Sequence, residues 1–211
     1  MPNLLTAKQP GDAVRITRNG SDPAIEDGWV LVRFEPGSGN AVAEKDGKRV
    51  ITERAAFDAL NFPGSDELWE MLSAPELDAE LLPVKAAWSK ADLPGVVSAL
   101  VKYARTLDPA FAGVQTASDM IEKAKEHEDS CQSSLEILRL DAARAKREYD
   151  QYPARTALEN DHKDNLLTRW RNLDDQYAAH RYQCDRLIPA WRRTSSALKA
   201  LTAFISTVTP A

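Results

Sequence analysis

The pattern of hydrophobic and polar positions divides the chain into three segments. Residues 12–62 carry short β-branched and aromatic runs separated by the turn dipeptides Asn19-Gly20 and Asp46-Gly47, which is typical of strands joined by hairpins. Residues 63–115 change to apolar positions at helical spacing, punctuated by proline. From residue 116 the apolar positions recur at alternating spacings of three and four, the heptad pattern of paired helices.

This pattern predicts an α+β protein that is mainly α. Residues 1–62 are expected to form a small β-barrel, residues 63–115 a short helical connector, and residues 116–211 a long antiparallel helical hairpin of the coiled-coil kind. The predicted strands cover 13–16, 28–34, 40–45 and 48–52, followed by a short helix at 53–60. Connector helices are predicted at 66–72 with Ser65 as cap, at 75–82 opened by Pro75, and at 94–107, where Asp108-Pro109 ends the helix.

The stretch "IEDGWVLVRF…KRV…FDALN" at 25–61 resembles SH3-like barrel modules found at the ends of larger bacterial proteins. The resemblance covers about a quarter of the chain. It implies that Trp29 and Phe34 could line an aromatic groove that binds a partner peptide. Aromatic residues in so small a barrel also serve as core, so both roles stay open for these two side chains.

The heptad pattern forms two apolar stripes, which we call the seam. The first runs from Ile121 to Tyr152 and the second from Leu166 to Val208, with Pro153 between them. In an antiparallel pair the numbers of opposed residues have a constant sum. A sum of 308 sets large side chains against small ones and places the hairpin tip at 153–158. Sums that differ by one heptad also keep the two stripes face to face.

With that register, the segment 191–208 extends beyond the start of the first long helix. Its apolar stripe must pack on the connector or on another chain, either a partner protein or a second copy in a homodimer. Pro189 is expected to kink the helix near this point. The stripe includes Trp191, Leu198, Leu201 and Ile205.

Composition and charge narrow the classes of function. The net charge of −5 argues against a protein that binds nucleic acid by broad neutralisation of phosphates. We find no charged start followed by an apolar run, and no run of about 18 apolar residues, so we expect neither a secretory signal nor a membrane span. Two cysteines do not make a disulfide scaffold. We therefore expect a reducing, cytoplasmic setting in which both thiols stay reduced.

Both cysteines occur in the same small pattern. "HEDSC" at 127–131 and "HRYQC" at 180–184 each place a histidine four residues before a cysteine, on one face of a helix. Two such pairs on neighbouring antiparallel helices supply the ligands of a closed, structural zinc site. His127 would oppose Cys184, and Cys131 would oppose His180, at a common sum of 311. Glu128 is a candidate hydrogen-bond partner for one of the imidazoles. The alternative is that Cys131, His180 and Cys184 are seam residues and that His127 is solvated.

These features favour a non-enzymatic protein-binding or assembly protein, an adaptor or inhibitor such as phages and bacteria encode, whose hairpin is clipped by zinc. A metal-dependent hydrolase that uses His127, Glu128 and His180 is an alternative, because "HEDSC" resembles the His-Glu-x-x-His motif with cysteine in the last place. A nucleic-acid-binding accessory factor is a third, because "RWR" at 169–171 and "WRR" at 191–193 mix arginine with tryptophan.

Overall fold

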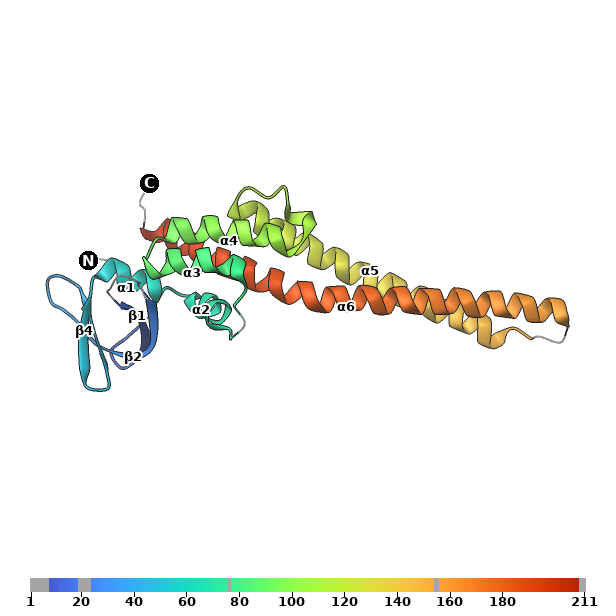
Figure 1. Ribbon diagram of the computed structural model, residues 1–211, viewed down its shortest axis with the longest axis horizontal. Coiled ribbons are helices and arrows are strands. Elements are labelled where there is room, and N and C mark those ends of the chain that lie inside the picture. The colour runs from blue at the N-terminus through green and yellow to red at the C-terminus, as the bar shows by residue number, and fades with distance from the viewer. Residues whose placement is uncertain (1–7, 19–23, 76, 154–155, 209–211) are drawn as a thin grey trace. The chain divides into compact units, whose positions relative to one another are not determined.

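A computed structural model describes residues 8–18, 24–75, 77–153 and 156–208, and confirms an α+β fold that is mainly helical. The chain divides into two compact units. One comprises Met1–Ile121 together with Arg192–Ala211, and the other comprises Glu122–Trp191. The segments predicted as barrel and connector thus fall in the same compact unit, with the last part of the final helix. Figure 1 shows the elements in chain order.

The N-terminal sheet is an antiparallel meander of four strands. The strands are β1 (Ala13–Arg18), β2 (Ala24–Phe34), β3 (Ala41–Lys45) and β4 (Lys48–Thr52), hydrogen-bonded in the order β1-β2-β3-β4. All four predicted strands are confirmed. The Asp46-Gly47 turn also forms as predicted, with positive φ at both residues, as a two-residue hairpin turn of this kind requires. The predicted turn at Asn19-Gly20 lies outside the described residues.

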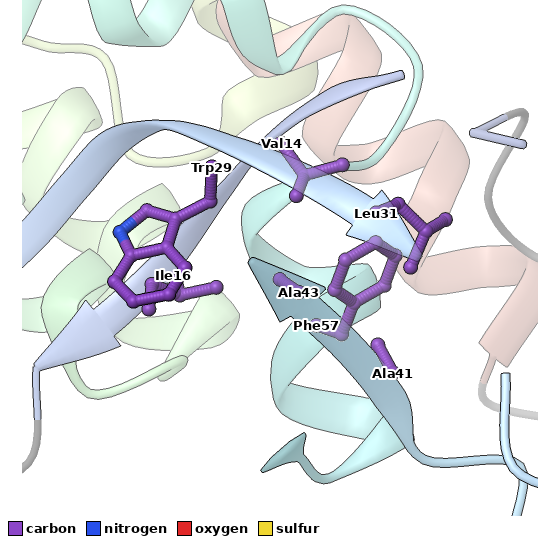
Figure 2. Packing of buried hydrophobic residues seen from close by; sticks show 7 residues of the cluster. All are labelled: Val14, Ile16, Trp29, Leu31, Ala41, Ala43 and Phe57. Atoms are coloured by element: carbon purple, nitrogen blue, oxygen red, sulfur yellow. The ribbon is translucent and has the colours of Figure 1, made fainter. Parts of the chain in front are cut away.

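Helix α1 (Arg54–Leu60) follows β4 and completes the core of the sheet. Figure 2 shows Phe57 of α1 beside Leu31 and Ala43 of the strands, in a cluster of buried apolar side chains. The alternation of these strands therefore buries one face of the sheet against the helix. The likeness to SH3-like modules stays a prediction. The remaining members of the cluster are Val14, Ile16, Trp29 and Ala41.

The connector is helical as predicted, with two local differences. Helix α2 (Ser65–Ser73) has Gly64 as its N-cap, in a left-handed conformation, so Ser65 is the first helical residue and not the cap. The predicted helix at 75–82 is wrong over the residues that are described. A single 3-10 turn, η1 (Ala79–Leu81), leads instead into helix α3 (Leu82–Ser89). The proline that opens this helix is Pro83, at its first turn, and not Pro75.

Helix α4 (Leu93–Leu107) ends at Asp108, as predicted, and a second 3-10 turn, η2 (Pro109–Phe111), follows it. The side chain of Asp92 caps the start of α4 by accepting a hydrogen bond from the Gly95 amide. This helix buries Leu100 and Ala104, which lie four residues apart on one face.

Helices α5 (Ala117–Gln151) and α6 (Ala157–Val208) form the predicted antiparallel hairpin, seen side by side in Figure 1. Each begins with a capping box, in which a threonine hydroxyl accepts from the amide three residues later and the acidic side chain there accepts from the threonine amide. The pairs are Thr116 with Asp119 and Thr156 with Glu159.

The predicted register of the hairpin is wrong by about one heptad. Cys131 is bonded to Cys184, a sum of 315, and Glu148 accepts from Arg169 at 3.1 Å, a sum of 317. A pairing at 308 would displace these contacts by about seven residues, or roughly 10 Å of helix. Both registers keep the seam facing itself, so the apolar pattern alone does not distinguish them.

The end of α6 packs within the first compact unit. Leu198 and Leu201 are fully buried there, and the ring of Phe204 stacks on that of Phe62 with centroids 5.4 Å apart. Of the two arrangements that the sequence left open for 191–208, the structure adopts packing on the chain's own residues. Pro189 lies inside α6, which continues through it as one helix.

The contact between Gly64 and Ala200 makes a test of this packing. Gly64 has φ +91, and a Cβ built on it would lie 2.6 Å from the Cβ of Ala200. Replacing Gly64 with alanine is expected to lower the free energy of unfolding by about 2 kcal/mol, because the new methyl group is both strained and overpacked. Chemical denaturation of the full chain would measure the loss. Gly113→Ala is the control, since its Cβ would meet nothing within 4 Å, and it should change stability by less than about 0.5 kcal/mol. Equal effects of the two changes would contradict the packing described here.

Candidate functional site in the helical hairpin

The seam residues of α5 and α6 position the candidate site. Ala142 and Ala145 of α5 and Cys184 of α6 are buried, whereas Leu135 and Leu173 remain half-buried. Such partial burial is the expected state of two helices that cover only one face of each other. The seam therefore places a row of side chains between the helices while leaving their edges open to solvent.

Cys131 and Cys184 meet across this row and form a disulfide, with Cα atoms 6.3 Å apart. They are 53 residues apart in the chain. The expectation of two separate reduced thiols is therefore not what the structure contains. The antiparallel direction of the two helices explains why the cysteines meet. Both cysteines lie on the seam, and the sum of their residue numbers is one that keeps the two apolar stripes face to face.

His180 lies one helical turn before Cys184 on the same face. Its Nε2 atom is 3.7 Å from the Cys184 sulfur. The ligand atoms of Cys131, His180 and Cys184 all lie within 4.8 Å of one another. Three of the four predicted zinc ligands are thus brought together, in a place where one is buried and two are half-buried.

His127 is the predicted ligand that the structure does not bring into this group. Its ring packs against Trp191, with centroids 5.9 Å apart and a tilted, edge-like geometry. The register explains the difference, because a four-ligand site needs a sum of 311 and the cysteines meet at 315. Four residues correspond to about 6 Å along a helix. Glu128, the predicted partner of an imidazole, is half-buried and accepts a hydrogen bond from Gln132 at 3.3 Å.

The predicted partner-binding residues lie mostly inside the protein. Trp29 is buried, and its indole N–H donates to Glu26 at 3.2 Å. Phe34 packs edge-on against Phe57 and lies under the Arg54 guanidinium. Trp191, Leu198 and Leu201 are buried, and Ile205 is half-buried. These side chains supply the core in this structure.

The exposed apolar side chains of the described residues include two neighbours on α5 that are not among the predicted partner-binding residues. Ile137 and Leu140 of α5 are 60% and 49% exposed. They lie three residues apart and therefore share one face of the helix. Leu138 and Ala142 point into the seam, so Ile137 and Leu140 lie outside it. Their position off the heptad pattern is the signal that could have found them.

Charged side chains surround this pair. Glu136 and Arg139 form an ion pair with a closest approach of 2.7 Å, and Asp141 lies 4.0 Å from Arg144. The Arg139 hydrogen bonds lower the pKa of the Glu136 carboxyl. We call Ile137, Leu140 and these four charged residues the α5 patch.

No protein-family model, curated protein or solved structure matches this chain. None of the helices in the described part of the chain combines the length and the apolar character needed to cross a bilayer. The chemistry of the hairpin itself is therefore the basis for the proposals that follow.

Proposed function

We propose that this is a non-enzymatic binding protein and that the α5–α6 hairpin is the arm through which it contacts a partner protein. The observation that carries the proposal is the α5 patch. Two large apolar side chains are held in solvent on a helix whose neighbouring surface is charged. Burying them against a partner would gain hydrophobic free energy that the isolated chain does not.

The composition of the α5 patch supports a protein partner. Protein interfaces commonly combine an apolar centre with a polar, partly exposed rim. Ile137 and Leu140 would form the centre, and the two ion pairs would form the rim. The rim contains both signs of charge, which suits a protein surface of mixed charge better than the uniformly negative backbone of a nucleic acid.

The disulfide and the paired helices support the same proposal in another way. A rigid arm loses little conformational freedom when it binds, so more of the contact energy appears as affinity. The hydrolase alternative requires His127 and His180 to share one metal ion. The contact of His127 with Trp191 does not favour that arrangement.

The experiment tests whether the α5 patch binds a partner. A photo-crosslinking amino acid at position 137 of the full-length, disulfide-bonded protein should join it to a host protein, which mass spectrometry identifies and which is then purified. The double change Ile137→Glu and Leu140→Glu is expected to weaken its binding at least tenfold, about 1.4 kcal/mol, because charge replaces the apolar centre.

Leu158→Glu is the matched control. Leu158 is an exposed apolar residue at the start of the other helix of the hairpin, so its change should leave affinity within about twofold. Far-UV circular dichroism should show that both proteins keep their helices. A partner that binds the double variant as tightly as the original chain would contradict the proposal, as would the absence of any specific crosslink at position 137.

A further inference from the structure

We propose that Cys131, Cys184 and His180 bind one Zn²⁺ ion when the disulfide is reduced. The hairpin would then have two alternative clips, a sulfur–sulfur bond and a thiolate-bound metal. This inference goes beyond the proposed binding function and does not depend on the α5 patch. It modifies the four-ligand site expected from the sequence, since it omits His127.

The geometry of His180 and Cys184 already matches a shared metal ion. Typical bonds to zinc of about 2.3 Å from sulfur and about 2.0–2.1 Å from nitrogen place the two ligand atoms roughly 3.6 Å apart around a tetrahedral ion. Their separation in the structure is 3.7 Å. The histidine therefore lies where a ligand would have to be, without any change of helix register.

Cys131 requires only a small movement. Two thiolates on one tetrahedral zinc lie roughly 3.8 Å apart, against about 2.0 Å in a disulfide. The sulfurs would separate by roughly 1.8 Å. Rotation about the side-chain bonds can supply much of this distance, because Cys131 is only half-buried and is not locked in the core.

The donor set indicates the class of metal. Two thiolates and an imidazole favour zinc or a similar borderline ion over magnesium or calcium, which prefer oxygen ligands. A fourth ligand completes the tetrahedron. The Glu128 carboxylate is not among the ligand atoms that lie within 4.8 Å of one another at this site, so we assign the fourth position to a water molecule.

The conversion between the two clips balances with a thiol reductant. Two equivalents of a low-molecular-weight thiol give up two electrons and two protons to the protein disulfide, which yields two protein thiols and one small-molecule disulfide. Zn²⁺ then binds the two sulfurs as thiolates and releases their two protons to solvent. The same sulfur atoms serve both clips, so each state excludes the other.

This exclusion has a measurable consequence. Zinc at 100 times its dissociation constant stabilises the reduced form about a hundredfold. For a two-electron couple, a factor of 100 raises the reduction potential of the disulfide by about 59 mV. The midpoint of a thiol-buffered redox titration of the full chain should therefore move to a less negative potential when free zinc is present.

Cobalt provides the direct spectroscopic test. Full-length protein, reduced by a phosphine under anaerobic conditions, is titrated with Co²⁺. The expected result is one ion per chain, with thiolate charge-transfer absorption in the ultraviolet and the visible bands of a four-coordinate ion. Addition of Zn²⁺ should displace it. The disulfide-bonded protein should show neither absorption.

Variants separate the proposed ligands from their neighbours. His180→Ala should weaken Co²⁺ binding at least tenfold, and Cys131→Ser with Cys184→Ser should abolish the charge-transfer band. Two variants are controls, His162→Ala in the same helix as His180 and His127→Ala in α5. Each should leave the affinity for Co²⁺ within about threefold of that of the original chain. Glu128→Gln should likewise leave binding within about threefold, because its carboxylate is not one of the three ligands.

Several outcomes would overturn the site. One is a reduced protein that keeps its helices by circular dichroism but takes up no Co²⁺. A second is equal binding by the original chain and the His180→Ala variant. A third is loss of binding in His127→Ala alone, which would restore the register of the four-ligand site. None of these results bears on crosslinking at position 137, so the two proposals fail separately.

Discussion

Reduction of the Cys131–Cys184 disulfide, in the absence of metal, is expected to lower the free energy of unfolding of the hairpin by about 4 kcal/mol. The two cysteines are 53 residues apart, and a crosslink over that length removes much of the freedom of the unfolded chain. The chain-entropy relation for a loop of this size gives the quoted magnitude.

The half-buried seam explains why the hairpin depends on this crosslink. Leu138 on one helix and Leu166 on the other both retain solvent contact, because the described residues of the unit Glu122–Trp191 contain no third helix that could cover them. The aromatic stack of Tyr149 on Trp170 and the cation of Lys146 near the Trp170 ring add modest contacts near the tip. Small cores of this kind commonly need a covalent or metal crosslink.

Guanidinium denaturation followed by circular dichroism, with and without a phosphine reductant and with a chelator present, measures the effect. The comparison uses one sequence in two redox states, so no core residue changes. A protein carrying Cys131→Ala and Cys184→Ala is the control, and the reductant should not move its midpoint. A reduced protein that unfolds at the same denaturant concentration as the disulfide-bonded one would show that the crosslink does not stabilise the hairpin.

The sequence predicts where the helices of this protein begin and end better than it predicts how the two long helices align with each other. Heptad spacing and Pro153 are local signals, and they correctly place the two long helices. Register is decided by contacts between the helices, such as the pair of Glu148 with Arg169, which no local pattern contains. An apolar stripe repeats every seven residues, so it leaves the choice between sums of 308 and 315 open.

The same ambiguity of register affects the prediction of the candidate site. The spacing of histidine and cysteine correctly places His180 beside Cys184, since four residues on a helix define that contact. It does not place His127, because that prediction needs the register as well. The bond between Cys131 and Cys184 was accessible in principle, since both are seam residues whose sum lies one heptad from 308. The expectation of a reducing compartment favours reduced thiols that bind a metal instead.

The second large effect on stability is expected at Asn61, whose side chain bonds to strand β1 of the N-terminal sheet. The pairing of β1 with β2 shifts register between Val14 and Ile16, so Arg15 leaves the regular ladder. The Asn61 side chain replaces the missing strand contacts. Its Oδ1 accepts from the Arg15 amide and its Nδ2 donates to the Arg15 carbonyl, each at 2.9 Å. Nδ2 also donates to the Phe57 carbonyl at 2.9 Å.

The contacts of the Arg15 side chain depend on the same position of the Arg15 backbone. Its guanidinium donates to the Ser65 hydroxyl at 3.0 Å, pairs with Asp66, and lies near the rings of Trp69 and Trp88. The hydrogen bond from Arg15 lowers the pKa of the Asp66 carboxyl. Asp66 is largely exposed, so we expect the ion pair itself to contribute little. The buried backbone contacts made by Asn61 matter more.

Asn61→Ala is therefore expected to lower the free energy of unfolding by about 4 kcal/mol, because it leaves the amide and the carbonyl of Arg15 buried without partners. Denaturation followed by tryptophan fluorescence measures the total, and hydrogen exchange should show that the Arg15 amide loses its protection. Asn165→Ala, at an exposed position of α6, is the control and should shift stability by less than about 0.5 kcal/mol. A cost below about 1 kcal/mol for Asn61→Ala, with the Arg15 amide still protected, would mean that another group satisfies this backbone.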